Sequence, residues 1–478
     1  MWNKYITRRL GVQVAQQWNY GFGKAMKETL GLSITDTLVY RDGKKTEYYV
    51  NKKQQEIYIQ GLYLLLADKN FIRGFHKKAQ NRLERILITT KKELNQDLSL
   101  LNNHELLNLY QKFILPNTEE FYIYMWTVFN IGEPLSNVVL NHLKKKNSYQ
   151  TKITEYLLSF SSPLKPNDVI NERIDLLKLA ILRKKLKSAD FNRRLNNHVL
   201  KYRHIPMFDF DHTPYHEKQF TEELLQIKNP EKELKEIKKH FSMRGREFKT
   251  RLLRLKPDAK LRQLLVFMKE NVFLRDYRDM IRQKLNIELR KFYLEIGSRL
   301  GLTIKQTATL TNSEIVEYIK SEKKFPKREI LAREKFYLLI QKKDTVEIFS
   351  GNKARSKAKT ELNVISHSRL KELNGVVGSI GRAKGKVQIV YTNRDLAKVK
   401  KGDVLVTAMT RQDFVPAIRK AVALITDEGS ITCHAAIIAR ELEIPCIVAT
   451  KHATRVLKDG DRVIVDASSE KGIIKICG

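Results

Sequence analysis

A histidine near the C-terminus stands where a phosphoryl group can be bound and transferred. His434 follows a β-branched run ending at Thr426 and a loop with Gly429 and Ser430, and an Ala- and Ile-rich helix begins near this histidine. Thr432 is a helix-capping residue type, which would put His434 in the first helical turn. Free amides and the positive helix end favour an anion there. Neutral imidazole is a phosphoryl nucleophile near pH 7, so the spacing predicts a phosphoryl carrier.

Two other interpretations of this segment stay open. His434 also fits a polar residue at the start of a purely structural helix. Cys433 is a second candidate nucleophile beside it, although neighbours in sequence seldom turn their side chains toward each other and no orienting acid is evident.

A second group of titratable residues lies mid-chain, between residues 204 and 217. Imidazole with carboxylate suits zinc, manganese or iron. The spacing matches no helical ligand pair such as HExxH, and Pro206 and Pro214 indicate a loop. We therefore predict no metal site here but a polar loop that lines a groove between domains. The residues that would ligate a metal, if one bound, are His204, Asp209, Asp211, His212 and His216.

The elements that would position His434 form a turn-rich C-terminal segment. Nine of the 21 glycines fall in the last 108 residues, and short β-branched runs alternate there with helices. Strands are predicted over 386–391, 403–407, 422–426, 446–450, 462–467 and 472–476, and helices over 412–421 and 434–442. This alternation predicts a compact sheet covered by helices.

The first 370 residues have a mostly helical pattern. A helical pattern runs to about Leu30, small hairpins are predicted within 37–50 and 336–349, and a long helix follows Pro257 and ends at Gly301. Its apolar residues step by three or four, which is typical of a packing face. Capping boxes are predicted at Asn102 to Glu105 and at Thr311 to Glu314.

Composition limits the function further. The chain has 478 residues, with 89 Lys and Arg against 53 Asp and Glu, a net charge of +36. A hydrophobic content of 42% excludes a disordered basic tail. Only 18 basic and 12 acidic residues follow residue 370, and no RNA-binding or finger motif accompanies the basic helices, so nucleic acid is an unexpected partner. Three cysteines and no membrane-length apolar run predict a cytoplasmic protein.

The segment Thr432-Cys-His-Ala-Ala-Ile-Ile-Ala-Arg-Glu-Leu442, followed by Ile444-Pro445, resembles the phosphohistidine signature of the phosphoenolpyruvate (PEP)-utilising enzymes, such as PEP synthase, pyruvate phosphate dikinase and rifampicin phosphotransferase. Residues 406–416 resemble the TxxMT…D…P segment of this family. Residues 375–387 resemble its opening strand, and 460–466 and 471–474 resemble its closing strands. The resemblance covers about residues 372–476. It implies a β/β/α swivelling domain that carries phosphohistidine between two distant sites.

Carried over to this sequence, the resemblance makes His434 the phosphoryl carrier. Thr432, Gly429 and Ser430 would contact the phosphoryl group, with Arg440 and Cys433 as supporting residues. The family usually has Gly-Gly where this chain has Gly429-Ser430, and Ser fits there if its φ is negative. Residues 275–351 are more loosely similar to the connecting region of the family.

We therefore expect an α+β multidomain chain, with a mostly helical N-terminal body that holds small β-hairpins and a C-terminal swivelling domain. The expected boundaries are a helical region with a hairpin over 1–100, a helical body over 101–350, a linker over 351–371 and the mobile domain over 372–478.

The expected activity is that of a phosphotransferase component. No nucleotide-binding glycine loop or barrel repeat is present, so ATP or PEP with magnesium would bind to a partner chain such as an ATP-grasp subunit, and pyruvate or another small molecule would accept the phosphoryl group. Two alternatives remain: a noncatalytic scaffold that keeps the mobile domain, and a basic helical protein that binds nucleic acid.

Overall fold

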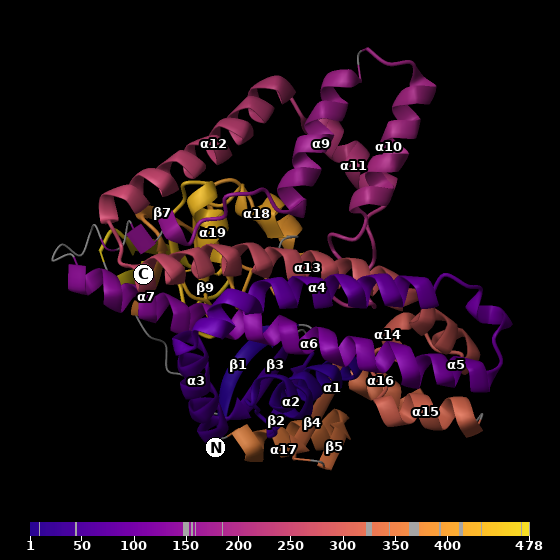
Figure 1. Ribbon diagram of the computed structural model, residues 1–478. Coiled ribbons are helices and arrows are strands. Elements are labelled where there is room, and N and C mark those ends of the chain that lie inside the picture. The colour runs from indigo at the N-terminus through magenta and orange to yellow at the C-terminus, as the bar shows by residue number, and fades with distance from the viewer. Residues whose placement is uncertain are drawn as a thin grey trace. The chain divides into compact units, whose positions relative to one another are not determined.

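The computed structural model places most of the chain in helices and adds two separate sheets (Figure 1). It describes residues 1–478 except 9, 44, 147–152, 154–155, 158, 184, 322–326, 344, 363–371, 392, 411–413, 432, 470 and 478. The chain divides into two compact units. Unit 1 comprises 1–67, 96–134 and 292–478, and unit 2 comprises 68–95 and 135–291. A mostly helical chain with two sheets agrees with the expected α+β class.

Unit 1 contains a five-stranded antiparallel sheet with the strand order β1-β3-β2-β4-β5. Its strands are β1 (Trp2–Arg8), β2 (Thr37–Asp42), β3 (Lys45–Asn51), β4 (Phe336–Lys342) and β5 (Thr345–Ser350). Both predicted hairpins are confirmed, and the pairing of β2 with β4 joins them into one sheet. The helical start predicted for the chain is wrong for β1. Its aromatic and β-branched residues suit a strand, and β3 supplies its hydrogen-bond ladder.

Residues 351–362, where the sequence predicted the start of a linker, form helix α17 (Gly351–Leu362). Its Ala354 and Ala358 are buried against Leu338 and Ile340 of β4. Small residues let the helix approach the sheet closely, so α17 belongs to the core of this part of unit 1. The rest of the predicted linker, 363–371, lies outside the described residues.

Unit 1 contains further helices outside the barrel. They are α1 (Val12–Tyr20), α2 (Met26–Leu30), α3 (Lys52–Ala67), α5 (Asn103–Leu109), α6 (Leu115–Asn130), α14 (Ile304–Thr307), α15 (Asn312–Ser321) and α16 (Lys327–Lys335). Both predicted capping boxes are confirmed, since Asn102 and Glu105 cap α5 reciprocally and Thr311 and Glu314 do the same for α15.

The C-terminal part of unit 1 is a closed barrel with the strand order β10-β6-β12-β11-β7-β8-β9. The strands are β6 (Glu372–Ser379), β7 (Gly381–Ile389), β8 (Asp403–Thr407), β9 (Ala423–Thr426), β10 (Cys446–Val448), β11 (Arg462–Ala467) and β12 (Lys471–Cys477), and the helices are α18 (Val415–Ile418), α19 (His434–Glu441) and α20 (Ala453–Val456). Every predicted strand is present. The fully buried Val404, Ile425 and Val463 belong to one apolar core.

Among the described residues of unit 2, helices are the only regular secondary structure, and loops connect them. Unit 2 contains α4 (Lys69–Glu93), α9 (Asp168–Leu182), α10 (Ser188–Tyr202), α11 (Glu217–Gln226) and α12 (Pro230–Leu255), while α7 (Gly132–Lys146) and α13 (Ala259–Leu300) have residues in both units. Helix α9 packs against α10, α11 and α12 (Figure 1). The long helix predicted after Pro257 is α13, and its stripe is buried as expected, with Ile281 and Leu285 each 2% exposed.

In the part of the chain that the structure describes, no helix combines the length and the apolar composition that a membrane span requires.

Candidate functional site

His434 lies where two parallel strands of the barrel end. Strands β8 and β9 are hydrogen-bonded neighbours that run in the same direction, so their carboxyl ends meet at one edge. The loop after β8 carries Thr410, and the loop after β9 leads through Gly429 to His434. Such carboxyl-end loops are where parallel sheets usually place ligand-binding side chains.

Helix α19 begins at His434, with Cys433 in the N-cap position. His434 is therefore in the first helical turn, as predicted. The sequence placed the cap one residue earlier, at Thr432, which lies outside the described residues. Cys433 has extended backbone angles and makes no side-chain cap bond, and it is only 5% exposed, so its thiol is a packing group at the helix start.

Thr410 holds the imidazole ring of His434. Its Oγ1 lies 2.9 Å from Nδ1, and the threonine is only 2% exposed. Thr410 had no predicted role, although it lies in the segment 406–416 that resembles the family. The sequence does carry a signal for Thr410. It is a hydroxyl side chain in the loop after the strand Asp403–Thr407, and the next strand, Ala423–Thr426, leads to His434. The contact between Thr410 and His434 is made by Nδ1, so a proton on Nδ1 would leave the lone pair of neutral imidazole on Nε2.

The loop before His434 needs glycine at position 429. Gly429 has a φ of +126°, and a Cβ added there would meet the Cys433 sulfur at 2.8 Å. Ser430 is absent from the described residues with positive φ, which removes the objection to serine in place of the usual second glycine. The carbonyl of Ser430 accepts a hydrogen bond from the amide of Cys433, which closes a turn directly before the helix.

Two charged residues fix the shape of this loop. Arg440 of α19 donates through Nη1 to the backbone carbonyls of Gly378 and Ile431, at 2.8 and 2.9 Å. Asp427 accepts from both the backbone amide and the hydroxyl of Thr454. These groups act on the protein backbone and on α20, so they position the loop and do not point to a ligand of their own.

Strand β1 contacts both loops of the site. Arg8 donates through Nη2 to the sulfur of Met409 at 2.9 Å, beside Thr410. The ammonium of Lys4 lies 3.7 Å from Glu428, next to Gly429. In this arrangement Nε2 of His434 is shielded from solvent. Access of any ligand to that nitrogen would therefore require the surrounding loops to move.

Glu47 of β3 links the sheet to the barrel through Arg455. Its carboxylate lies 2.7 Å from Nη2 of Arg455, 3.2 Å from Lys45 and 3.8 Å from Lys4, and its side chain is 8% exposed. Burial alone would raise the pKa of Glu47, but these cations outweigh it and lower the pKa to about 2. Burial raises the pKa of Glu428 to about 7, because Lys4 opposes it only in part.

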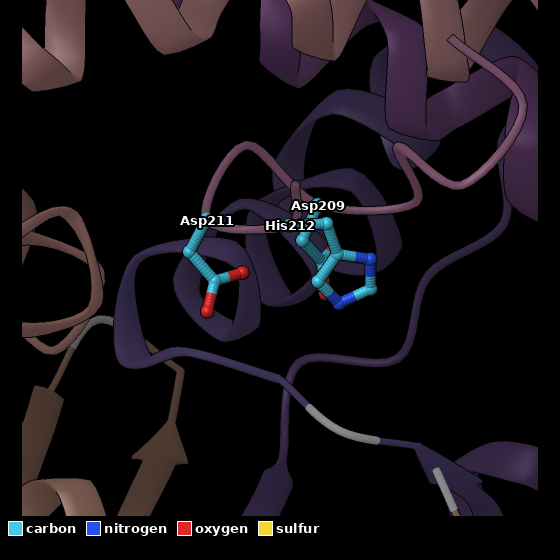
Figure 2. A group of neighbouring side chains, drawn as sticks. All are labelled: Asp209, Asp211 and His212. Atoms are coloured by element: carbon cyan, nitrogen blue, oxygen red, sulfur yellow. The ribbon is translucent and has the colours of Figure 1, made fainter. Parts of the chain in front are cut away.

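The five mid-chain candidates separate into three groups. Asp209, Asp211 and His212 come together, with one donor atom of each within 4.8 Å of the others (Figure 2). His204 instead contacts Asp168 through Nε2 at 2.8 Å. His216 occupies the N-cap position of α11. Of the five residues that would ligate a metal if one bound, the structure therefore brings only Asp209, Asp211 and His212 together.

Residues 399–470 match the sequence profile of the family described as PEP-utilising enzyme, mobile domain. A probable phosphoenolpyruvate synthase of Archaeoglobus fulgidus is 53% identical over 102 residues, which are 21% of this chain and 13% of that protein. The phosphoenolpyruvate synthase of Pyrococcus furiosus is 49% identical over 106 residues, 22% of this chain and 13% of that protein. The phosphoenolpyruvate synthase of Aeropyrum pernix is 43% identical over 147 residues, which are 30% of this chain and 17% of that protein.

The chain thus spans less than a fifth of the length of these relatives. The matched residues 399–470 include strands β8 to β11 and His434. The chain carries, over residues 399–470, the mobile domain of the PEP-utilising enzymes.

Proposed function

We propose that this protein is a phosphotransferase component in which His434 is transiently phosphorylated on Nε2. The observation that carries the proposal is the placement of His434 at the first position of α19 with Nδ1 held by Thr410, in a domain of the PEP-utilising family. In the first half-reaction Nε2 attacks the phosphorus of the donor, a P–N bond forms and the P–O bond to the leaving group breaks. In the second, an acceptor oxygen attacks phosphorus and the P–N bond breaks.

Thr410 orients the imidazole ring of His434 through its contact with Nδ1. When Nδ1–H donates to the Thr410 hydroxyl, neutral imidazole keeps its lone pair on Nε2, which is the nucleophilic form. The hydroxyl also stops the ring from turning about its own axis. Thr410 is in this account a positioning residue that orients the ring.

The start of α19 stabilises the product. The first-turn amides of a helix lack intrahelical acceptors, and the positive helix end attracts negative charge. A phosphoryl group on the histidine that begins α19 lies beside those amides. Gly429, Ser430 and Thr432 are the loop residues that we propose line its other side.

The donor, ATP or PEP with magnesium, would bind to a partner chain. The carboxylates beside His434 do not fit a magnesium site, because Asp427 accepts two hydrogen bonds from Thr454 and Glu428 lies against Lys4. The same reasoning assigns pyruvate or another small molecule as the acceptor bound elsewhere. We place this chemistry in the cytoplasm, which suits the free thiols of Cys433, Cys446 and Cys477.

Radiolabel transfer tests the proposal. The chain is incubated with [γ-32P]ATP or with 32P-labelled PEP, magnesium and a soluble extract of its source cells. We expect acid-labile label on the wild type and on His104→Gln, which changes an exposed histidine of α5, and none on His434→Gln. Equal label on the wild type and on His434→Gln would refute the proposal, and absence of label with both donors would favour the noncatalytic scaffold.

A second candidate function rests on helix α4. Its exposed face forms a shallow groove of about 540 Å³ lined mainly by Arg73, Lys77, Lys78, Arg82 and Arg85. Such a row of cations suits the phosphates of nucleic acid. A salt titration of binding to a short RNA or DNA decides this, since phosphate neutralisation requires a steep loss of affinity as salt rises.

A further inference from the structure

The loop between α10 and α11 brings two carboxylates and an imidazole to one point in unit 2. Donor atoms of Asp209, Asp211 and His212 all lie within 4.8 Å of one another. Figure 2 shows the side chains of Asp211 and His212 projecting to the same side of the loop. Asp209 is only 5% exposed, so the group includes a carboxylate that is withdrawn from bulk water.

Helix α13 holds the backbone of this loop in place. Asn286 donates through Nδ2 to the carbonyl of Met207 at 3.1 Å. Arg290 donates through Nη1 to the carbonyls of Phe210 and His212, at 2.8 and 3.0 Å. The amide of His212 donates to the carbonyl of Asp209, which closes the turn that carries the three side chains. The donor set is therefore built by fixed backbone contacts.

The tautomer of His212 is fixed by a carbonyl. Its Nδ1 lies 3.0 Å from the backbone oxygen of Pro206, and a carbonyl oxygen can only accept, so Nδ1 carries the proton. In neutral imidazole the lone pair is then on Nε2. Metal-binding histidines characteristically donate their second ring nitrogen to a carbonyl or carboxylate in this way. This observation is independent of the proximity of the three side chains.

We propose that Asp209, Asp211 and His212 bind one divalent transition-metal ion. The ligands would be one carboxylate oxygen from each aspartate and Nε2 of the histidine. A mixed oxygen and nitrogen set suits Mn²⁺ or Zn²⁺ better than Mg²⁺, which prefers oxygen. Three protein ligands leave coordination positions for water or for an oxygen-bearing ligand.

Arg290 limits the affinity of the site. Its charge interacts with Asp211, so a bound cation is opposed by the same guanidinium that holds the loop. The two carboxylates still exceed this single positive charge. We therefore expect saturable binding.

Isothermal titration of the metal-stripped full chain with Zn²⁺, and separately with Mn²⁺, tests the site. We expect one saturable site, and at least about tenfold weaker binding for Asp211→Asn and for His212→Gln. His216→Gln makes the same change at an exposed histidine of the same connecting segment and should bind as the wild type does. A Co²⁺ absorption spectrum of the wild type should change on His212→Gln, since a nitrogen ligand is lost.

Circular dichroism without metal checks that each variant is folded. Asp211 is partly exposed, so Asp211→Asn decides the result if His212→Gln unfolds. Absence of a saturable site for both metals would overturn the proposal. So would wild-type affinity in Asp211→Asn and in a folded His212→Gln, because the metal would then be bound elsewhere.

Discussion

Replacing Glu47 by glutamine should expose His434 more often. The cations around Glu47 lower its pKa from 4.5 to about 2, a change that corresponds to about 3 kcal/mol of net interaction with the charged carboxylate. Only Arg455 among these cations belongs to the barrel, and it is the closest, at 2.7 Å. We assign about 1 to 2 kcal/mol to the contact between sheet and barrel, because glutamine still accepts a hydrogen bond but carries no charge. Loss of that energy raises the open fraction about 5- to 30-fold.

Acylation of His434 by diethyl pyrocarbonate, followed by mass spectrometry of its peptide, measures this opening. We expect the initial rate to rise 5- to 30-fold in Glu47→Gln. Glu347→Gln, which changes an exposed carboxylate of β5 in the same sheet, should react as the wild type does. A Glu47→Gln/Arg455→Gln double mutant should show no further increase beyond the larger single effect. An unchanged rate in Glu47→Gln would refute the idea that this contact shields His434.

Three further predictions concern the His434 loop. Thr410→Val should slow labelling of His434 about fivefold, because one hydrogen bond worth about 1 kcal/mol is lost, and Thr410→Ser should restore the rate. Labelling rates for Thr410→Val equal to wild type would exclude the positioning role. Gly429→Ala should lower the free energy of unfolding by about 1 to 3 kcal/mol in urea titration, because of the positive φ and the Cys433 sulfur, and an unchanged midpoint would contradict the loop geometry. The pKa of Glu428 is raised from 4.5 to about 7, so between these pH values the folded state holds a proton that the unfolded state has released. The free energy of unfolding therefore falls as pH rises through 7. Urea titrations should show that it falls by up to about 3 kcal/mol from pH 5 to 8, and Glu428→Gln should not show this decrease.

The strands of the barrel were predictable because each one has a recognisable pattern in its own sequence. Runs such as Asp403–Thr407 and Arg462–Ala467 are short, β-branched and bounded by turns, so each one identifies itself without its partners. The start of α19 was predictable for the same reason, since a Gly- and Ser-containing loop precedes an Ala- and Ile-rich run.

Features that depend on distant pairing were not predictable. Residues Trp2–Arg8 form a strand because β3 lies beside them, and nothing in their own spacing shows that partner. The link between Glu47 and Arg455 joins residues 408 positions apart. Thr410 and His434 meet only because β8 and β9 are parallel neighbours, a fact that the strand sequence alone leaves open.

The mid-chain loop shows both cases. Its proline punctuation predicted a loop, and its residue types predicted where a metal would bind if one did. Which side chains converge depends on the carbonyl contacts with Asn286 and Arg290 of α13, some 80 residues away. His204 does not join this group, because its Nε2 contacts Asp168 at the start of α9.

The central claim is that His434 carries a phosphoryl group, and mass spectrometry of the labelled chain tests it most directly. After reaction with donor and partner extract under alkaline quenching, the account predicts one phosphoryl group on the peptide that contains His434, lost on brief acid treatment, with phosphorus NMR showing it on Nε2. Phosphate at another residue of the same chain, with His434 unmodified in a sample that transfers label onward, would contradict it.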